Sequence, residues 1–222
     1  MSNRYEHKES PYSSHSLLLG LLPANGHGLK LLDVGCWDGK VSAQYLERGF
    51  LVTGIERSRH SNLAKGIELV VADLNHGLPE LTGKFDYVVC ADVLEHLLDP
   101  LKILRSLRAQ MTVNGKLLAS LPNSGHWYFR LMVLLGRFPK DPNGLFDATH
   151  LHFFTWDGWV KLFREAEFVV DRVEPSSIPL SLILPSVNPG ITIAIGERLN
   201  YWLGRLWMRL FAYQFVVTFK IN

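Results

Sequence analysis

The stretch that decides the fold is Leu31–Gly39, which reads LLDVGCWDG. Leu29–Val34 has the composition of a buried strand, and it runs into a glycine turn that opens a predicted helix over Lys40–Arg48. In an open α/β sheet, ligands bind beyond the carboxyl ends of the strands, where glycine lets the backbone approach closely. We therefore expect a ligand site at this turn.

The turn does not fit a nicotinamide cofactor. The GxGxxG fingerprint would need glycines at positions 37 and 40, where the chain has Trp37 and Lys40. Instead, Asp33 stands two residues before Gly35. An acid here is of little use to a phosphate binder, but it suits the ammonium group of S-adenosylmethionine. A tight turn without a ligand is the alternative.

Strand and helix patterns alternate on both sides of this turn, which predicts βαβ units and a parallel sheet. The further strands are expected at Leu51–Ile55, Glu68–Val71, Phe85–Cys90, Lys116–Leu121, Phe168–Val173 and Phe215–Ile221. Two helices are expected at Pro100–Gln110 and Trp156–Ala166, with Asn114-Gly115 as a turn and Thr155 as an N-cap.

Each of the next three predicted strands is also followed by an acid. Glu56 ends its strand and could accept hydrogen bonds from both ribose hydroxyls. Asp73 could accept from the adenine amino group, with Leu74 covering the ring, although an acid there could equally cap a turn. Asp92 is expected at the cleft floor, near the methionine end of the cofactor and the acceptor.

The segments DVGCWDG, GIE, ADLN and ADVLEH resemble, in this order, the class I S-adenosylmethionine-dependent methyltransferases. A similarity to MetW-like methyltransferases, and more so to those encoded among bacterial glycan genes, is carried by residues 121–139 and 144–168 and by the closing FAYQFVVTFK. The resemblance implies a Rossmann-like three-layer α/β sandwich whose seven-stranded, mostly parallel sheet has an antiparallel last strand inserted beside its neighbour. We expect one domain over residues 1–222, with insertions 123–150 and 175–210 covering the substrate.

The resemblance also implies a set of cofactor-binding residues. Tyr12 is expected to close the site from the N-terminal segment, although it could equally lie in a mobile tail. Trp37 stands where relatives commonly have glycine, so its ring must point away from the cofactor or stack on it. The set is Tyr12, Asp33, Gly35, Cys36, Trp37, Gly39, Glu56, Arg57, Asp73, Leu74, Ala91, Asp92 and Val93.

Methyl transfer from a sulfonium often needs a base that removes the acceptor proton, and histidine titrates in the right range. The catalytic candidates are His126, ranked first because it follows the fifth strand, and His150 and His152. His96 also falls at a plausible place. For each histidine, a capping or packing role is the alternative. His150 and His152 share a face on an extended segment, but no third metal ligand has obvious spacing, so we predict no metal site.

Composition excludes other classes. The chain has 23 basic and 21 acidic residues, a net charge of +2, whereas nucleic-acid binders usually carry a strongly basic domain. We expect no nucleic-acid partner. Two distant cysteines, Cys36 and Cys90, predict no disulfide framework and suit the cytoplasm. Leu17–Leu22 is too short for a signal-peptide core, and the uncharged segment Pro175–Gly196 contains four prolines, so a spanning helix is not expected.

Within the second insertion, Glu197–Phe211 has the apolar periodicity of one amphipathic helix. The stripe consists of Leu199, Trp202, Leu203, Leu206, Trp207, Leu210 and Phe211. We expect this stripe to pack on the sheet or to cover the acceptor cleft. A homodimer contact and a peripheral membrane contact are the alternatives, since arginines opposite Trp and Leu fit an interfacial helix.

The sequence therefore predicts an S-adenosylmethionine-dependent methyltransferase. O-methylation of a sugar, a glycan precursor or a related small molecule is the first hypothesis. A MetW-like, non-catalytic partner of an acyltransferase in methionine biosynthesis is the second. A protein that uses residues 197–211 as a membrane-surface anchor is the third.

Overall fold

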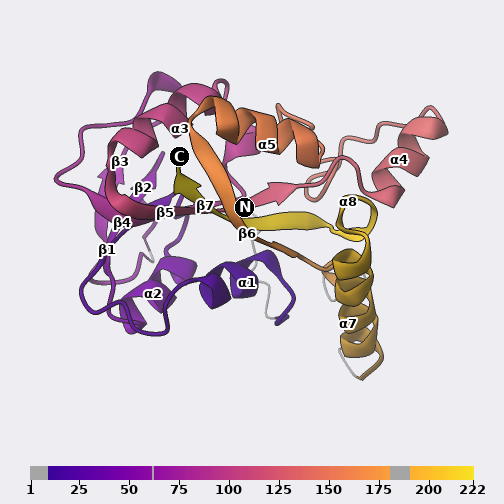
Figure 1. Cartoon of the computed structure of the whole chain (residues 1–222), viewed down its shortest axis with the longest axis horizontal. Helices are drawn as coiled ribbons and strands as arrows, with labels where there is room; N and C mark the ends of the chain where they lie inside the picture. Colours follow the sequence, from indigo (N-terminus) through magenta and orange to yellow (C-terminus); the bar gives the residue numbers. More distant parts are fainter. Residues whose placement is uncertain (1–9, 62, 181–190) are drawn as a thin grey trace.

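The computed structural model describes residues 10–61, 63–180 and 191–222, which form a sheet flanked by helices (Figure 1). The strands are β1 (Lys30–Val34), β2 (Leu51–Glu56), β3 (Glu68–Val71), β4 (Phe85–Ala91), β5 (Met111–Pro122), β6 (Phe168–Pro175) and β7 (Gln214–Ile221). The helices are α1 (Ser14–Leu21), α2 (Lys40–Glu47), η1 (Leu74–His76), η2 (Leu94–His96), α3 (Pro100–Ala109), α4 (Trp127–Leu134), α5 (Trp156–Glu165), α7 (Ile191–Leu206) and α8 (Met208–Phe211).

The seven strands lie in the order β3-β2-β1-β4-β5-β7-β6. The pairs from β3 to β5 are parallel, whereas β7 is antiparallel to both β5 and β6. The order reverses between β2-β1 and β4, which places the carboxyl ends of β1 and β4 side by side. The predicted sheet, with its last strand inserted beside its neighbour, is confirmed.

Both faces of the sheet are covered, so neighbouring residues of one strand enter different cores. Leu31 of β1 packs with α1 and α2, while Leu32 packs on the side of α3 and α5. Val88 and Val89 of β4 divide in the same way. Figure 1 shows the two helical layers on opposite sides of the strands. Burial on both faces explains why these strands read as continuous apolar runs.

The turn predicted at Asn114-Gly115 was wrong. Both residues lie inside β5, which begins at Met111. The pairing with β4 shifts there, since Phe85 pairs with Met111 but Tyr87 pairs with Lys116. The extra residues are taken up as an irregularity within a continuous strand, and a bulge of this kind uses the same residue types as a turn.

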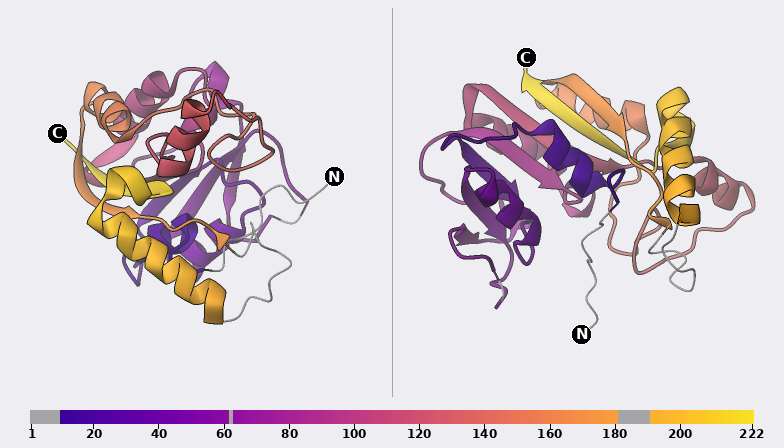
Figure 2. Two further views of the ribbon diagram at one scale, coloured as in Figure 1. Left: turned by 90° about the vertical axis from the view of Figure 1, so that its right-hand side faces the viewer. Right: turned by 90° about the horizontal axis from the view of Figure 1, so that it is seen from below.

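The predicted helix Glu197–Phe211 is in fact two helices, α7 and α8, separated at Trp207. Its apolar stripe does not pack on the sheet: Leu199, Trp202, Leu206 and Trp207 are between 56% and 85% exposed. Together with α4, these helices stand at one end of the molecule (Figures 1 and 2).

The opposite face of α7 makes the contacts with the sheet. Glu174, at the end of β6, accepts hydrogen bonds from the Tyr201 hydroxyl at 3.1 Å and from Arg205 at 2.7 Å. Gly204 approaches Pro175 so closely that a Cβ would lie 2.9 Å from the proline Cβ. Hydrogen bonds to Glu174 and the close approach at Gly204 therefore orient the helix, and its apolar stripe does not.

Among the described residues, no helix has the length and apolar character needed to cross a membrane. The uncharged segment singled out above lies partly outside the described residues, because 181–190 are not among them.

Candidate functional site

A cavity of about 380 Å³ lies beyond the carboxyl ends of β1, β2, β3 and β4. Its walls come from the four strand ends and the turns that follow them. The lining residues are His15, Asp33, Gly35, Cys36, Trp37, Asp38, Lys40, Val41, Ile55, Glu56, Arg57, Ala72, Asp73, Leu74, Asn75, Ala91, Asp92, Val93, His96 and Leu97. The volume falls within the range of about 300–1,000 Å³ that is usual for small-molecule sites.

The turn after β1 is shaped by its glycines. Gly35 has a φ of +74°, and a Cβ there would lie 2.5 Å from Cγ2 of Val93. Gly39, with a φ of +76°, begins α2 as its N-cap, and a Cβ there would meet Leu63 at 2.7 Å. Any other residue at either position would be strained and would have to displace a neighbour.

Asp33 is almost fully buried at the end of β1, with 3% of its surface exposed. The Ser42 hydroxyl donates to its Oδ2 at 2.5 Å. Burial raises the pKa of this carboxyl to about 6, the Ser42 hydrogen bond lowers it, and the nearby Glu56 raises it. A buried carboxylate facing a cavity can pair with a cation from a ligand.

Glu56 holds the next turn through both carboxylate oxygens. Oε2 accepts from the backbone N–H of Trp37 at 2.9 Å, and Oε1 accepts from that of Arg57 at 2.7 Å. Each carboxylate oxygen can accept a second hydrogen bond, so Glu56 can still bind a diol. Trp37 takes a positive φ of 48°, and its ring contacts the ring of His60, with centroids 4.4 Å apart.

Asp73 caps a turn, as its sequence position allowed, and it also lines the cavity. It caps η1, where Oδ1 accepts from the backbone N–H of Asn75 at 3.0 Å. It also lines the cavity and forms an ion pair with Arg57 at 3.3 Å. The hydrogen bond from Asn75 is the main cause that holds the pKa of the Asp73 carboxyl below its usual value, so the group is an anion at neutral pH.

Asp92 is held in place by side chains from two other strands of the sheet. Its Oδ1 accepts from the Ser120 hydroxyl at 2.5 Å and from Nε2 of Gln214 at 2.7 Å. Its φ of +54° is uncommon for a residue other than glycine. Ser120 lies on β5 and Gln214 on β7, so the inserted antiparallel strand fixes this carboxylate.

Two of the predicted cofactor residues do not line the cavity. Tyr12 stacks on Tyr201 of α7, with ring centroids 4.7 Å apart, and its carbonyl accepts from the Ser177 N–H. His15, three residues further on, lines the cavity from the same segment. Gly39 does not line the cavity itself, and it is the N-cap at which α2 begins.

His126, ranked first as the general base, is buried and lies outside the cavity lining. It is the N-cap of α4, and its Nδ1 accepts from the Tyr128 N–H at 3.3 Å. Burial lowers its pKa to about 4. Within the described part of the chain, its Nε2 is buried without a hydrogen-bond partner. His152 is also outside the lining, since its Nε2 contacts the Leu97 carbonyl at 2.8 Å and its ring stacks on Phe154.

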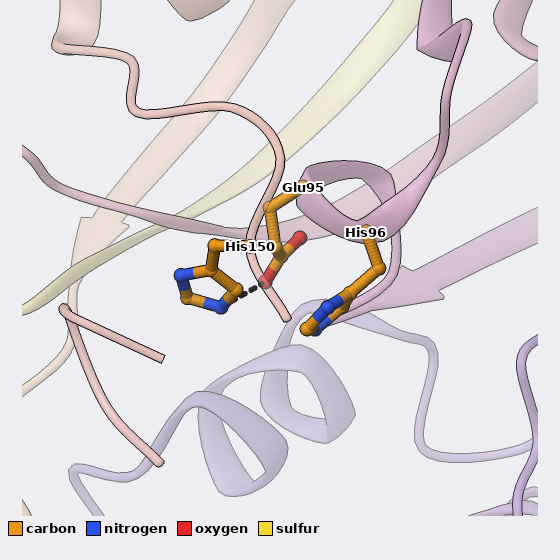
Figure 3. Close-up of side chains that lie close together, drawn as sticks. All are labelled: Glu95, His96 and His150. Carbon is orange, nitrogen blue, oxygen red and sulfur yellow. Dashed lines mark ion pairs between the residues drawn. The ribbon is translucent and has the colours of Figure 1, made fainter. Parts of the chain in front are cut away.

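His150 lies behind the wall of the cavity. Its ring centroid is 4.8 Å from that of His96, which lines the cavity, and its Nε2 is 3.8 Å from Oε1 of Glu95 (Figure 3). Burial, together with the neighbouring His96, lowers the pKa of His150 to about 4, so the ring is neutral at pH 7.

The two insertions do not line this cavity with any described residue. The first, 123–150, reaches it only indirectly, through His150 and Thr149, which contact His96. The second ends in α7 and α8, at the far end of the sheet (Figure 2). The described residues of both insertions thus lie outside this lining, and their role as a cover over the substrate stays a prediction.

Residues 5–173 match a family described as "Methyltransferase domain". The chain belongs to this family. Two curated relatives, both ubiquinone biosynthesis O-methyltransferases, come from Haemophilus ducreyi and Histophilus somni. The first is 34% identical over 126 residues, covering 50% of this chain and 53% of the relative. The second is 31% identical over 118 residues, covering 47% and 50%. The chain thus spans about half the length of these relatives.

Solved structures share the fold of this methyltransferase-family chain. An S-adenosylmethionine-dependent methyltransferase from Mesorhizobium loti has a TM-score of 0.62 and 16% identity, covering 93% of this chain and 97% of that one. The 1,6-didemethyltoxoflavin-N1-methyltransferase of Burkholderia thailandensis, solved with S-adenosylhomocysteine, has a TM-score of 0.58 and 16% identity, covering 94% and 76%.

Sequence reasoning missed several lining residues of this methyltransferase-family chain. His15 and Leu97 carried no local signal, because only the fold brings their segments to the cavity. Asn75 could have been found, since it directly follows the Asp73–Leu74 pair. In the structure its Oδ1 accepts from the Leu98 N–H at 2.9 Å. His96, which the sequence placed among the plausible histidines, does line the cavity.

Proposed function

We propose that the chain is an S-adenosylmethionine-dependent methyltransferase. The observation that carries the proposal is that the acids following four successive strands, Asp33, Glu56, Asp73 and Asp92, all line one cavity. The curated relatives and solved structures named above bear methyltransferase names, which supports the same reaction class.

Three of the four acids each have a group of the cofactor to recognise. The Asp33 carboxylate pairs with the methionine ammonium, which a buried anion attracts strongly. Glu56 accepts from the ribose hydroxyls, and Asp73 from the adenine amino group, while Leu74 covers the ring. Gly35, Cys36, Trp37, Arg57, Ala91 and Val93 complete the walls, with Gly39 and Tyr12 supporting them from outside.

The acceptor binds at the end of the cavity formed by Asp92 and His96. A hydroxyl oxygen of the acceptor forms the new bond to carbon, the sulfur–carbon bond breaks with its electron pair left on sulfur, and the hydroxyl proton is released. The donor is already activated, so alignment of oxygen, methyl carbon and sulfur supplies most of the rate. Among the three histidines predicted to be catalytic, two contact lining residues: the His150 ring packs against His96, and the His152 ring contacts the Leu97 carbonyl.

The acceptor is a sugar, a glycan precursor or a related small molecule. O-methylation is supported by the names of the curated relatives, and the glycan assignment by the resemblance of residues 121–139 and 144–168. The test is a methyl-transfer screen with labelled S-adenosylmethionine against nucleotide sugars, lipid-linked saccharides and phenols, with the product mass and methylation site determined.

We expect one class of hydroxyl acceptor to gain a single methyl group, and Glu56→Ala to lose at least tenfold in cofactor affinity. Cofactor binding without transfer to any acceptor would overturn the enzymatic proposal and favour a non-catalytic, MetW-like partner. Transfer to nitrogen or carbon would overturn the O-methylation.

We also propose that α4, α7 and α8 contact an anionic membrane surface. The support is their exposed apolar side chains, among them Trp127, Leu134, Trp202 and Leu206. Residues 127–140 and 191–211 together carry six basic side chains, of which Arg205 is paired with Glu174 and Arg209 with Asp157, and a single acid, Glu197, which is buried. Basic and aromatic residues on one surface suit an interface with anionic lipid.

Co-sedimentation with vesicles of phosphatidylglycerol and phosphatidylcholine tests this contact. We expect binding that is lost with Trp202→Glu plus Trp207→Glu and kept with Val113→Glu, an apolar site on β5 that is even more exposed than the two tryptophans. Absence of binding by the wild type, combined with a dimer that the double variant dissociates, would contradict the membrane contact and assign the surface to a second copy.

A further inference from the structure

The side chains of Glu95, His96 and His150 lie close together (Figure 3), and of the three only His96 lines the cavity. Glu95 and His96 belong to η2, directly after β4, while His150 comes from the long connection before α5. One coordinating atom from each lies within 4.8 Å of the others. The sequence showed only the pair His150 and His152; the fold supplies two other groups to His150.

Burial makes this cluster unusual. Glu95 has no exposed surface, and the His150 side chain is 7% exposed. The gap of 3.8 Å between His150 Nε2 and Glu95 Oε1 is too long for a hydrogen bond. It is close to the separation of about 3.4 Å between two ligands of one tetrahedral ion with bonds of about 2.1 Å. Carboxylates taken this far from water are usually paired or bound to metal.

The surrounding contacts orient His96 for coordination. Its Nδ1 lies 3.1 Å from both the carbonyl and the hydroxyl oxygen of Thr149. A carbonyl only accepts, so Nδ1 carries the proton and Nε2 keeps the lone pair. Thr149 is itself fixed by Asp147, whose Oδ1 accepts from its N–H at 2.8 Å and its hydroxyl at 2.6 Å. Outer contacts of this kind are typical of histidines that bind metal.

We propose that Glu95, His96 and His150 bind one divalent transition-metal ion of the Zn²⁺ type. Two imidazoles and one carboxylate are a ligand set suited to zinc or iron and poorly suited to magnesium. Because His96 lines the cavity, the ion keeps an open position toward the acceptor. If the proposed methyltransferase function holds, this position takes the acceptor hydroxyl and lowers its pKa.

The test uses the full chain, stripped of metal with a chelator, dialysed and titrated with ZnCl2 by calorimetry, with bound metal counted by mass spectrometry. We expect one equivalent of zinc to bind and MgCl2 at the same concentration not to bind. Glu95→Gln and His150→Gln should each weaken zinc binding at least tenfold. His152→Gln is the matched control, because it lies on the same segment outside the cluster, and it should bind zinc as the wild type does.

S-adenosylhomocysteine is titrated into every variant in parallel, which reports folding and the cofactor site separately from the metal. If Glu95→Gln does not fold, His150→Gln and His96→Gln carry the test. No saturable zinc binding by the wild type, or wild-type affinity in the folded cluster variants, would overturn the metal site. Zinc binding without any cofactor binding or methyl transfer would overturn the proposed function and leave the metal site standing.

Discussion

At the scale of single residues, the burial of Asp33 disfavours its ionised form in the folded chain. The residue is buried at the carboxyl end of β1, beside Glu56, and no cationic side chain contributes to its shifted pKa. Burial raises that pKa from 3.8 to about 6, which means that the folded chain resists ionising this group. An ammonium group from the cofactor would supply the missing positive charge.

The first prediction concerns the pH dependence of cofactor binding. Below about pH 6, Asp33 is protonated and no longer attracts the ammonium group. We expect the affinity for S-adenosylhomocysteine to fall about tenfold between pH 7.5 and pH 5, measured by calorimetry. Asp33→Asn should bind weakly at both pH values. A wild-type affinity that does not change over this range would contradict the role of Asp33.

The second prediction concerns stability at the same residue. Because the folded-state pKa is raised, the free energy of unfolding falls as pH rises from about 4 to about 6, and the loss is complete above that. Asp33→Asn should therefore stabilise the chain at pH 7.5 by up to about 3 kcal/mol and change little at pH 4. Urea unfolding at both pH values measures this, with Glu80→Gln as an exposed control. An equal change in the free energy of unfolding at the two pH values would contradict this prediction.

At the scale of elements, α7 shows that the apolar periodicity of a helix does not tell which of its faces contacts the sheet. Its apolar periodicity predicted a face packed on the sheet, but that face is exposed and the helix is held by Tyr201, Gly204 and Arg205. Hydrophobic periodicity says that a helix has an apolar side. It does not say what that side contacts, because a second copy or a membrane leaves the same pattern.

The third prediction uses two helical glycines as a matched pair. A Cβ at Gly204 would lie 2.9 Å from Cβ of Pro175, whereas at Gly20, in α1, nothing lies within 4 Å. Alanine favours a helix over glycine by about 0.8–1 kcal/mol. Gly20→Ala should stabilise the chain by roughly that amount, and Gly204→Ala should destabilise it by about 1–2 kcal/mol. Urea unfolding measures the free energy of unfolding of both variants. Stabilisation by Gly204→Ala would disprove the close packing of α7 on β6.

Most of the sheet and the turn after β1 could be predicted, because their signals are local. The strand Lys30–Val34, the glycines at 35 and 39 and the acids at strand ends are each read within a few residues. The turn at Asn114-Gly115 could not be told from a bulge, since turns and bulges favour the same residues.

At the scale of the whole molecule, the groups that the sequence did not bring together come from distant segments. Gln214 on β7 reaches Asp92 after β4, and His150, in the connection before α5, reaches Glu95 of η2. The first contact depends on where β7 inserts between β5 and β6, which no local pattern specifies. His126 was ranked by its place after a strand, but the chain turns there into α4 and uses its ring as a cap.

The central claim is that four strand-end acids form one cofactor site. Titration of S-adenosylhomocysteine into the wild type, Asp33→Asn and Glu56→Ala tests it most directly, because it needs no acceptor. We predict saturable binding of one molecule per wild-type chain and at least a tenfold loss in each variant. Absence of wild-type binding, or unchanged binding by both variants, would contradict the claim.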